Sequence, residues 1–119
     1  NFDGHHFIHD AVSRGAGAVL AQEVPEVPAT VPSLFVPDTL SAYGALAQHH
    51  RKSLKIKIVA ITGSTGKTTT KEMAAAILSK KYRTTKTEKN ENNRIGVPKT
   101  LLGITPETEV AVVELGSNL

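Results

Sequence analysis

The chain has 119 residues, of which 39% are hydrophobic, so it is long enough for one small domain or for parts of two. Fourteen Lys and Arg residues against 11 Asp and Glu residues give a formal net charge of +3, and only 4% of the residues are aromatic. A mild positive charge without stacking aromatic side chains suits phosphate ligands and argues against a nucleic-acid partner. The absence of cysteine excludes disulfides, thiolate metal sites and cysteine nucleophiles.

No stretch of the sequence approaches the ~20 consecutive apolar residues that a membrane-spanning helix needs. The first residues do not form a basic and then apolar targeting segment either, so we expect a soluble cytoplasmic protein. The start at Asn1, without an initiator Met, and the end at Leu119, just after an apolar strand, lead us to expect part of a longer chain.

Short helical and strand patterns alternate in the first half of the chain. A helix is predicted in DGHHFIHDAVSRGA, capped by Asp3, and AVLAQ is predicted as a strand. The proline-rich VPEVPATVP reads as a loop, SLFV as a second strand, and Asp38 as the cap of a second helix. His5 and His9 lie one helical turn apart, but no third ligand with suitable spacing accompanies them, so we interpret them as solvated or capping side chains.

A charged segment, RKSLKIK at residues 51–57, separates this half from the next, and we predict a domain boundary between residues 54 and 55. IKIVAIT is predicted as a buried parallel strand, and KTTTKEMAAAILSKKY as a helix with Thr70, Met73, Ile77 and Leu78 on its inward face. RTTKT is predicted as a second strand, IGVPKTLLGI as a short helix, and TEVAVVELG as a third, buried strand. The alternation predicts an α/β fold with a parallel or mixed sheet covered by helices.

The stretch VAITGSTGKTTTKEM joins the predicted strand to the predicted helix through a glycine-rich turn. Gly63 and Gly66 let backbone N–H groups approach an anion without a Cβ in the way, and the helix adds its positive N-terminal end. Lys67 is placed to contact the β and γ phosphates of a nucleotide, and Thr68 to bind Mg²⁺ through its hydroxyl. The other residues of this predicted phosphate-binding loop are Ser64, Thr65 and Thr69.

Glu114 follows the apolar residues VAVV at the end of the last predicted strand. In proteins with a phosphate loop, a carboxylate at the end of a neighbouring strand usually makes a second contact with the magnesium ion. Burying an unpaired carboxylate is costly, so an ionised glutamate at this position is best explained by a bound cation that pairs with it. We therefore predict that Glu114 and Thr68 are metal ligands; an edge carboxylate without a ligand is the alternative.

Three motifs in this order, ITGSTGKTTTKEM, NENNRIGVPKTLL and VVELGSN, resemble the ATP-dependent Mur ligases of peptidoglycan synthesis. NFDGHHFIHDAVSRGAGAVL and FVPDTLSAYGALAQHHR are similar to that family's substrate-recognition domain and to the segment that leads into its ATPase domain. The resemblance implies that residues 1–54 are the C-terminal part of a small UDP-substrate-binding α/β domain. It implies that residues 55–119 are the N-terminal part of a P-loop, parallel-sheet ATPase domain. Lys89 departs from the family pattern, which has glycine at this position.

Within the family, the motifs are most similar to the ligases that join D-alanyl-D-alanine to UDP-N-acetylmuramoyl-tripeptide. The resemblance implies that ATP phosphorylates the terminal carboxylate of the tripeptide and that the amine of D-alanyl-D-alanine attacks the acyl phosphate, with Mg²⁺ as cofactor. It also implies a full-length protein that is a monomer. Lys67 and Glu114 are then the expected catalytic residues, and Asn92 and Asn93 are expected to contact phosphate or substrate. A role as turn residues is the alternative for both asparagines, and the motif does not decide which of them matters.

Two other functions stay open at this point. The first is another ATP-dependent ligase of the same fold, such as folylpolyglutamate synthase, although those enzymes usually read G-K-G-S where this chain has GKTTTK. The second is a nucleotide-binding module without catalysis, because part of a longer chain can bind phosphate and ligate nothing.

Overall fold

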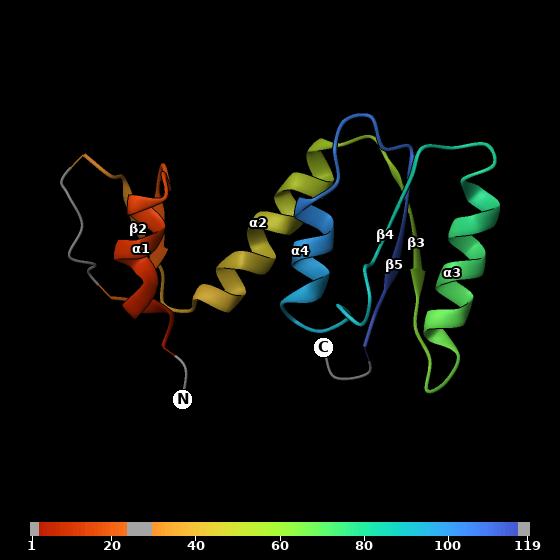
Figure 1. Ribbon diagram of the computed structural model, residues 1–119, viewed down its shortest axis with the longest axis horizontal. Coiled ribbons are helices and arrows are strands. Elements are labelled where there is room, and N and C mark those ends of the chain that lie inside the picture. Colours follow the sequence, from red (N-terminus) through yellow and green to blue (C-terminus); the bar gives the residue numbers. More distant parts are fainter. Residues whose placement is uncertain (1–2, 24–29, 117–119) are drawn as a thin grey trace. The chain divides into compact units, whose positions relative to one another are not determined.

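The computed structural model describes residues 3–23 and 30–116, which form two compact units that divide between Ala42 and Tyr43 (Figure 1). The first unit contains the 3₁₀ helix η1 (Gly4–Phe7), the helix α1 (Ile8–Ser13) and the parallel strands β1 (Val19–Ala21) and β2 (Ser33–Phe35). The helix and strands predicted in this unit are confirmed. Of the predicted proline-rich loop, residues 24–29 lie outside the described residues.

Two aspartates cap helices as the sequence predicts. Asp3 Oδ1 accepts a hydrogen bond from His5 N at 2.9 Å, at the start of η1. Asp38 Oδ1 accepts one from Leu40 N at 2.9 Å, in the first turn of α2 (Thr39–Ser53). The His5 ring also has two partners, since Nδ1 lies 2.7 Å from Asp3 Oδ1 and Nε2 accepts from Gln22 N at 3.2 Å. The histidine thus contributes to the fold of the first unit.

The second unit is a three-stranded parallel sheet with helices on both sides (Figure 1). Its elements in chain order are β3 (Lys57–Ile61), α3 (Lys67–Leu78), β4 (Thr84–Lys86), α4 (Gly96–Leu102) and β5 (Val110–Glu114). The strand order is β3-β5-β4, so the last strand lies in the middle and all five of its residues are buried. The predicted α/β class, the parallel pairing and the buried last strand are confirmed.

The core of this unit lies between the sheet and α4. It consists of the buried residues Ile104, Ala111 and Val113, with half-buried side chains packed against them from Leu54, Ile56, Ile58, Val97, Leu101 and Leu115. His50, near the end of α2, donates from Nε2 to the Ile104 carbonyl at 2.8 Å. The predicted domain boundary between residues 54 and 55 stays a prediction.

Two predictions about burial are wrong. Strand β3 is not buried, because it lies at the edge of the described sheet, and Ala60 on it is exposed. On α3, Met73 and Ile77 are 61% and 69% exposed, whereas the buried residues are Lys71 and Ala75. The inward face of the helix therefore carries Lys71 and Ala75, and the apolar pattern alone does not identify it.

Lys89 adopts a φ of 46°, and among the described residues it is the one non-glycine position with positive φ. The glycine that related motifs carry here fits this left-handed turn. We expect Lys89→Gly to raise the free energy of unfolding by about 0.5–1 kcal/mol, because the relieved strain of about 1–2 kcal/mol exceeds the added backbone entropy cost of glycine. Urea unfolding measures the change. Lys80→Gly, in an ordinary turn, is the control and should lose stability; an equal loss in both variants would refute the strain.

Candidate functional site: a phosphate loop beside a buried glutamate

The loop between β3 and α3 has the backbone geometry of an anion site. Gly63 and Gly66 have φ values of 146° and 73°, which L side chains rarely adopt, and Gly66 is the N-cap of α3. Lys67, the first residue of α3, folds back over the loop and donates from Nζ to the Gly63 carbonyl at 2.7 Å. The positive end of the helix and an ammonium group therefore point into the same small region.

Glu114 is brought to this loop by the register of the sheet. Ile61, two residues before Gly63, pairs with Glu114 across β3 and β5, so the strand ends that carry the loop and the carboxylate are neighbours. The Glu114 side chain is 1% exposed, and its Oε1 accepts from Asn92 Nδ2 at 2.7 Å and lies 3.5 Å from Thr68 Oγ1. Its other oxygen, Oε2, is buried without a hydrogen-bond partner.

A pocket of about 390 Å³ lies where these groups meet. It is lined by Ser64, Thr65, Gly66, Lys67, Thr68, Thr69, Asn90, Asn92 and Glu114. The structure thus brings together most of the residues that the sequence singled out. Asn90 was not among them.

The two asparagines of the NENN motif have different places. Asn92 faces the pocket, and its carbonyl accepts a hydrogen bond from Gly116 N at 2.7 Å, which ties the loop to the end of β5. Asn93 does not line the pocket; its Oδ1 accepts from Ile95 N and Gly96 N at 3.0 and 2.8 Å. Asn93 therefore holds the start of α4, and Asn92 is the one in contact with the candidate site.

Lys71 is the charged residue of this site that sequence reasoning missed. It is 0% exposed, and its Nζ donates to the Lys89 carbonyl at 3.1 Å and lies 3.8 Å from Glu114 Oε2. The spacing in the sequence could have identified it. Residues four apart on a helix share a face, and Lys71 follows Lys67 by four residues.

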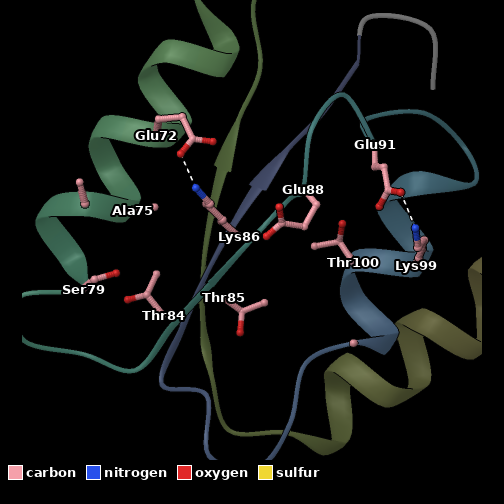
Figure 2. Close-up of a pocket in the computed structure, with 12 residues that line it drawn as sticks. Glu72, Ala75, Ser79, Thr84, Thr85, Lys86, Glu88, Glu91, Lys99 and Thr100 are labelled. Atoms are coloured by element: carbon pink, nitrogen blue, oxygen red, sulfur yellow. Dashed lines mark hydrogen bonds and ion pairs between the residues drawn. The ribbon is translucent and has the colours of Figure 1, made fainter.

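A second, larger pocket of about 610 Å³ lies between α3, β4 and α4 (Figure 2). Four of its charged side chains form two pairs: Lys86 contacts Glu72, and Lys99 contacts Glu91. The bond from Lys86 holds the pKa of Glu72 below its usual value, and the bonds to Glu72 and Glu91 raise the pKa values of Lys86 and Lys99. Within the described part of the chain, the buried side-chain atom without a hydrogen-bond partner is Glu114 Oε2, so the smaller pocket is the better candidate.

The donor set around Glu114 fits a divalent cation that arrives with other ligands. No group of three or more His, Cys, Asp or Glu side chains capable of holding a metal occurs among residues 3–23 and 30–116. Mg²⁺, however, is commonly bound by one or two protein oxygens together with substrate phosphates, at about 2.1 Å. Thr68 Oγ1 and Glu114 Oε1, 3.5 Å apart, are close enough for both to contact one such ion.

A parallel α/β sheet, a glycine loop leading into a helix and a carboxylate on the adjacent strand define a P-loop nucleotide-binding domain. Residues 61–119 match the Mur ligase middle domain. The chain is 49% identical over 117 residues to the UDP-N-acetylmuramoyl-tripeptide--D-alanyl-D-alanine ligase of Escherichia coli (strain K12) and 44% identical over 116 residues to that of Bacillus subtilis (strain 168). These matches cover 98% and 97% of the chain. The chain belongs to the Mur ligase family, and it spans 25% of the length of each of these two relatives.

Solved structures give the same result. The chain superimposes on MurF from Acinetobacter baumannii with a TM-score of 0.88 at 40% identity, covering 98% of this chain and 25% of that one. A MurF ligase from Thermotoga maritima, in complex with ADP, gives a TM-score of 0.84 at 32% identity, covering 98% of this chain and 27% of that one. Among the residues that the structure describes, no helix has the length and apolar character needed to cross a membrane.

Proposed function

We propose that this chain provides the phosphate- and magnesium-binding part of an ATP-dependent ligase that joins D-alanyl-D-alanine to UDP-N-acetylmuramoyl-tripeptide. The similarity to ligases of that name supports this choice of substrates, and a cytoplasmic location is part of the proposal. The observation that carries the proposal is the pocket that Lys67, Thr68 and Asn92 line together with Glu114, a buried carboxylate whose Oε2 has no hydrogen-bond partner.

The reaction requires positioning and charge neutralisation more than acid–base chemistry. A carboxylate does not react with an amine at neutral pH until one of its oxygens becomes a good leaving group. Transfer of the γ-phosphoryl group of ATP to the tripeptide carboxylate provides that leaving group, and attack by the amine of D-alanyl-D-alanine then forms the amide and releases phosphate. The protein must hold the phosphates in line and offset their charge.

The residues of the pocket match these tasks. The loop from Gly63 to Gly66 offers backbone N–H groups to the phosphates, and Lys67 exchanges its bond to the Gly63 carbonyl for phosphate oxygens. Thr68 and Glu114 would hold Mg²⁺, which neutralises charge on the phosphates when bound. Asn92 orients Glu114 through its bond to Oε1. Of the two asparagines, only Asn92 keeps a proposed role at the nucleotide.

Calorimetric titration with Mg·ATP and Mg·ADP tests the proposal. We expect the chain to bind both, and Lys67→Ala to weaken binding at least about tenfold, because hydrogen bonds to charged groups contribute about 1.5–3 kcal/mol. Lys80→Ala, an exposed lysine beyond the end of α3, is the matched control and should bind as the wild type does. Equal affinities of Lys67→Ala and the wild type would contradict the assignment of the loop.

A chimera separates ligation from mere nucleotide binding. The 119 residues can replace the matching quarter of the Escherichia coli ligase, to which they are 49% identical. Ligation of D-alanyl-D-alanine by this chimera, lost on Lys67→Ala, is the expected result. Nucleotide binding by a folded chimera that forms no amide would favour the noncatalytic module instead.

A further inference from the structure

Lys71 is a buried cation with three polar neighbours. Its Nζ donates to the Lys89 carbonyl at 3.1 Å and lies 3.3 Å from Glu72 Oε1 and 3.8 Å from Glu114 Oε2. A fully buried ammonium group is costly unless it is paired, so these neighbours explain its place. The distance to Glu114 Oε2 is too long for a hydrogen bond, which leaves the lone pairs of that oxygen available while the two charges still interact.

The charge balance of the pocket disfavours a bare metal ion. Among the residues that line it, Glu114 is the one acidic side chain, and Lys67 is the one basic side chain. Lys71 adds a second positive charge, with its Nζ 3.8 Å from Glu114 Oε2. Glu72 also contacts Lys71, but it pairs with Lys86 and lines the larger pocket. A divalent cation alone would therefore meet two ammonium groups for the one carboxylate that lines the smaller pocket, whereas the phosphates of a nucleotide reverse this balance.

We propose that Lys71 is a positioning residue that makes the site select the cation–nucleotide complex over the bare divalent cation. The inference rests on the proposed function, since it takes Thr68 and Glu114 as the ligands of the metal. Lys71 offsets the charge of Glu114 until phosphate arrives, and it holds the Lys89 turn beside the pocket. Its role is thus distinct from that of Lys67, which contacts phosphate.

Binding of bare Mn²⁺ as a probe tests this role without nucleotide. We measure protein-bound Mn²⁺ by equilibrium dialysis and electron paramagnetic resonance in the absence of nucleotide. Lys71→Gln removes the charge but keeps a donor for the Lys89 carbonyl, and it should bind bare Mn²⁺ at least about tenfold more tightly. Repulsion between a unit charge and a divalent ion a few ångström apart reaches that size even in the dielectric of bulk water.

Two variants serve as controls. Lys71→Arg keeps the charge and should bind bare Mn²⁺ as the wild type does. Lys86→Gln removes the other lysine that contacts Glu72, but Lys86 lines the larger pocket, so Mn²⁺ binding should not change.

A gain in metal affinity distinguishes this role from a structural one, because loss of packing would weaken Mn²⁺ and Mg·ADP together. Unchanged or weaker Mn²⁺ binding by folded Lys71→Gln would overturn the inference. If circular dichroism shows that Lys71→Gln is unfolded, the wild type is tested instead. The wild type should bind Mn²⁺ at least about tenfold more tightly with ADP than without ADP. Equal affinities would overturn the inference. A chain that fails to bind Mg·ADP, while Lys71→Gln still gains Mn²⁺ affinity, would refute the proposed function alone.

Discussion

Replacing Glu114 with glutamine is expected to weaken Mg·ADP binding about 100-fold. The change removes the one acidic group that lines the pocket but keeps the side-chain shape, and an amide oxygen can still accept the bond from Asn92. Loss of even the outer partners of a metal site lowers affinity or activity by about 10–100-fold, and the loss of a charged ligand belongs at the upper end of this range. The effect should be confined to the metal-dependent part of binding, because the phosphate loop is unchanged.

Titrations with ADP in the presence and absence of Mg²⁺ separate the two parts. The wild type should gain affinity from Mg²⁺, and Glu114→Gln should not. Glu107→Gln is the control, since Glu107 is exposed and lies before β5, at the opposite end of the strand from Glu114. A full Mg²⁺ response in Glu114→Gln would mean that the carboxylate is not a ligand.

Gly96→Ala is expected to destabilise the second unit by about 1–3 kcal/mol. A Cβ at position 96 would lie 2.4 Å from the Glu91 carbonyl carbon and 2.5 Å from its Cα, far inside van der Waals contact. The clash is with backbone, so it cannot be relieved by a side-chain rotation, and overpacking of this kind costs about 1–3 kcal/mol or more. The loop must move, and Asn92 lies on it.

Urea unfolding measures the loss, and titration with Mg·ADP under folding conditions shows whether the displaced loop also weakens nucleotide binding. Gly44→Ala is a control of opposite sign. It lies inside α2, where an added Cβ would have nothing within 4 Å, so alanine should stabilise the helix there by about 1 kcal/mol. Wild-type stability in Gly96→Ala would show that the loop yields to the extra methyl group without cost.

Much of the fold follows from local patterns in the sequence. The continuous apolar run VAVV predicts a strand buried on both faces, and β5 is that strand. The caps Asp3 and Asp38 mark helix starts because their side-chain oxygens satisfy free backbone N–H groups. The glycine loop is equally readable, since positive φ at Gly63 and Gly66 is a local requirement.

What could not be predicted depends on contacts between distant segments. The order β3-β5-β4 puts β3 at the edge, and a hydrophobic pattern carries no information about which strand is central. The burial of Lys71 depends on Glu114 and Lys89, which lie 43 and 18 residues away in the sequence. Asn92 and Asn93 are indistinguishable as residue types, and only the tertiary structure gives one to the pocket and the other to α4.

The central position of β5 makes the two walls of the candidate site mechanically unequal. Hydrogen bonds to β3 and β4 hold β5 on both sides and every residue of it is buried, so it can open only when the whole unit unfolds. The facing wall, from Gly63 to Gly66, is exposed loop that opens at much lower free energy. Glu114 thus serves as a fixed reference point, and we expect any adjustment to different phosphate lengths to occur in the glycine loop or in the loop that carries Asn90 and Asn92.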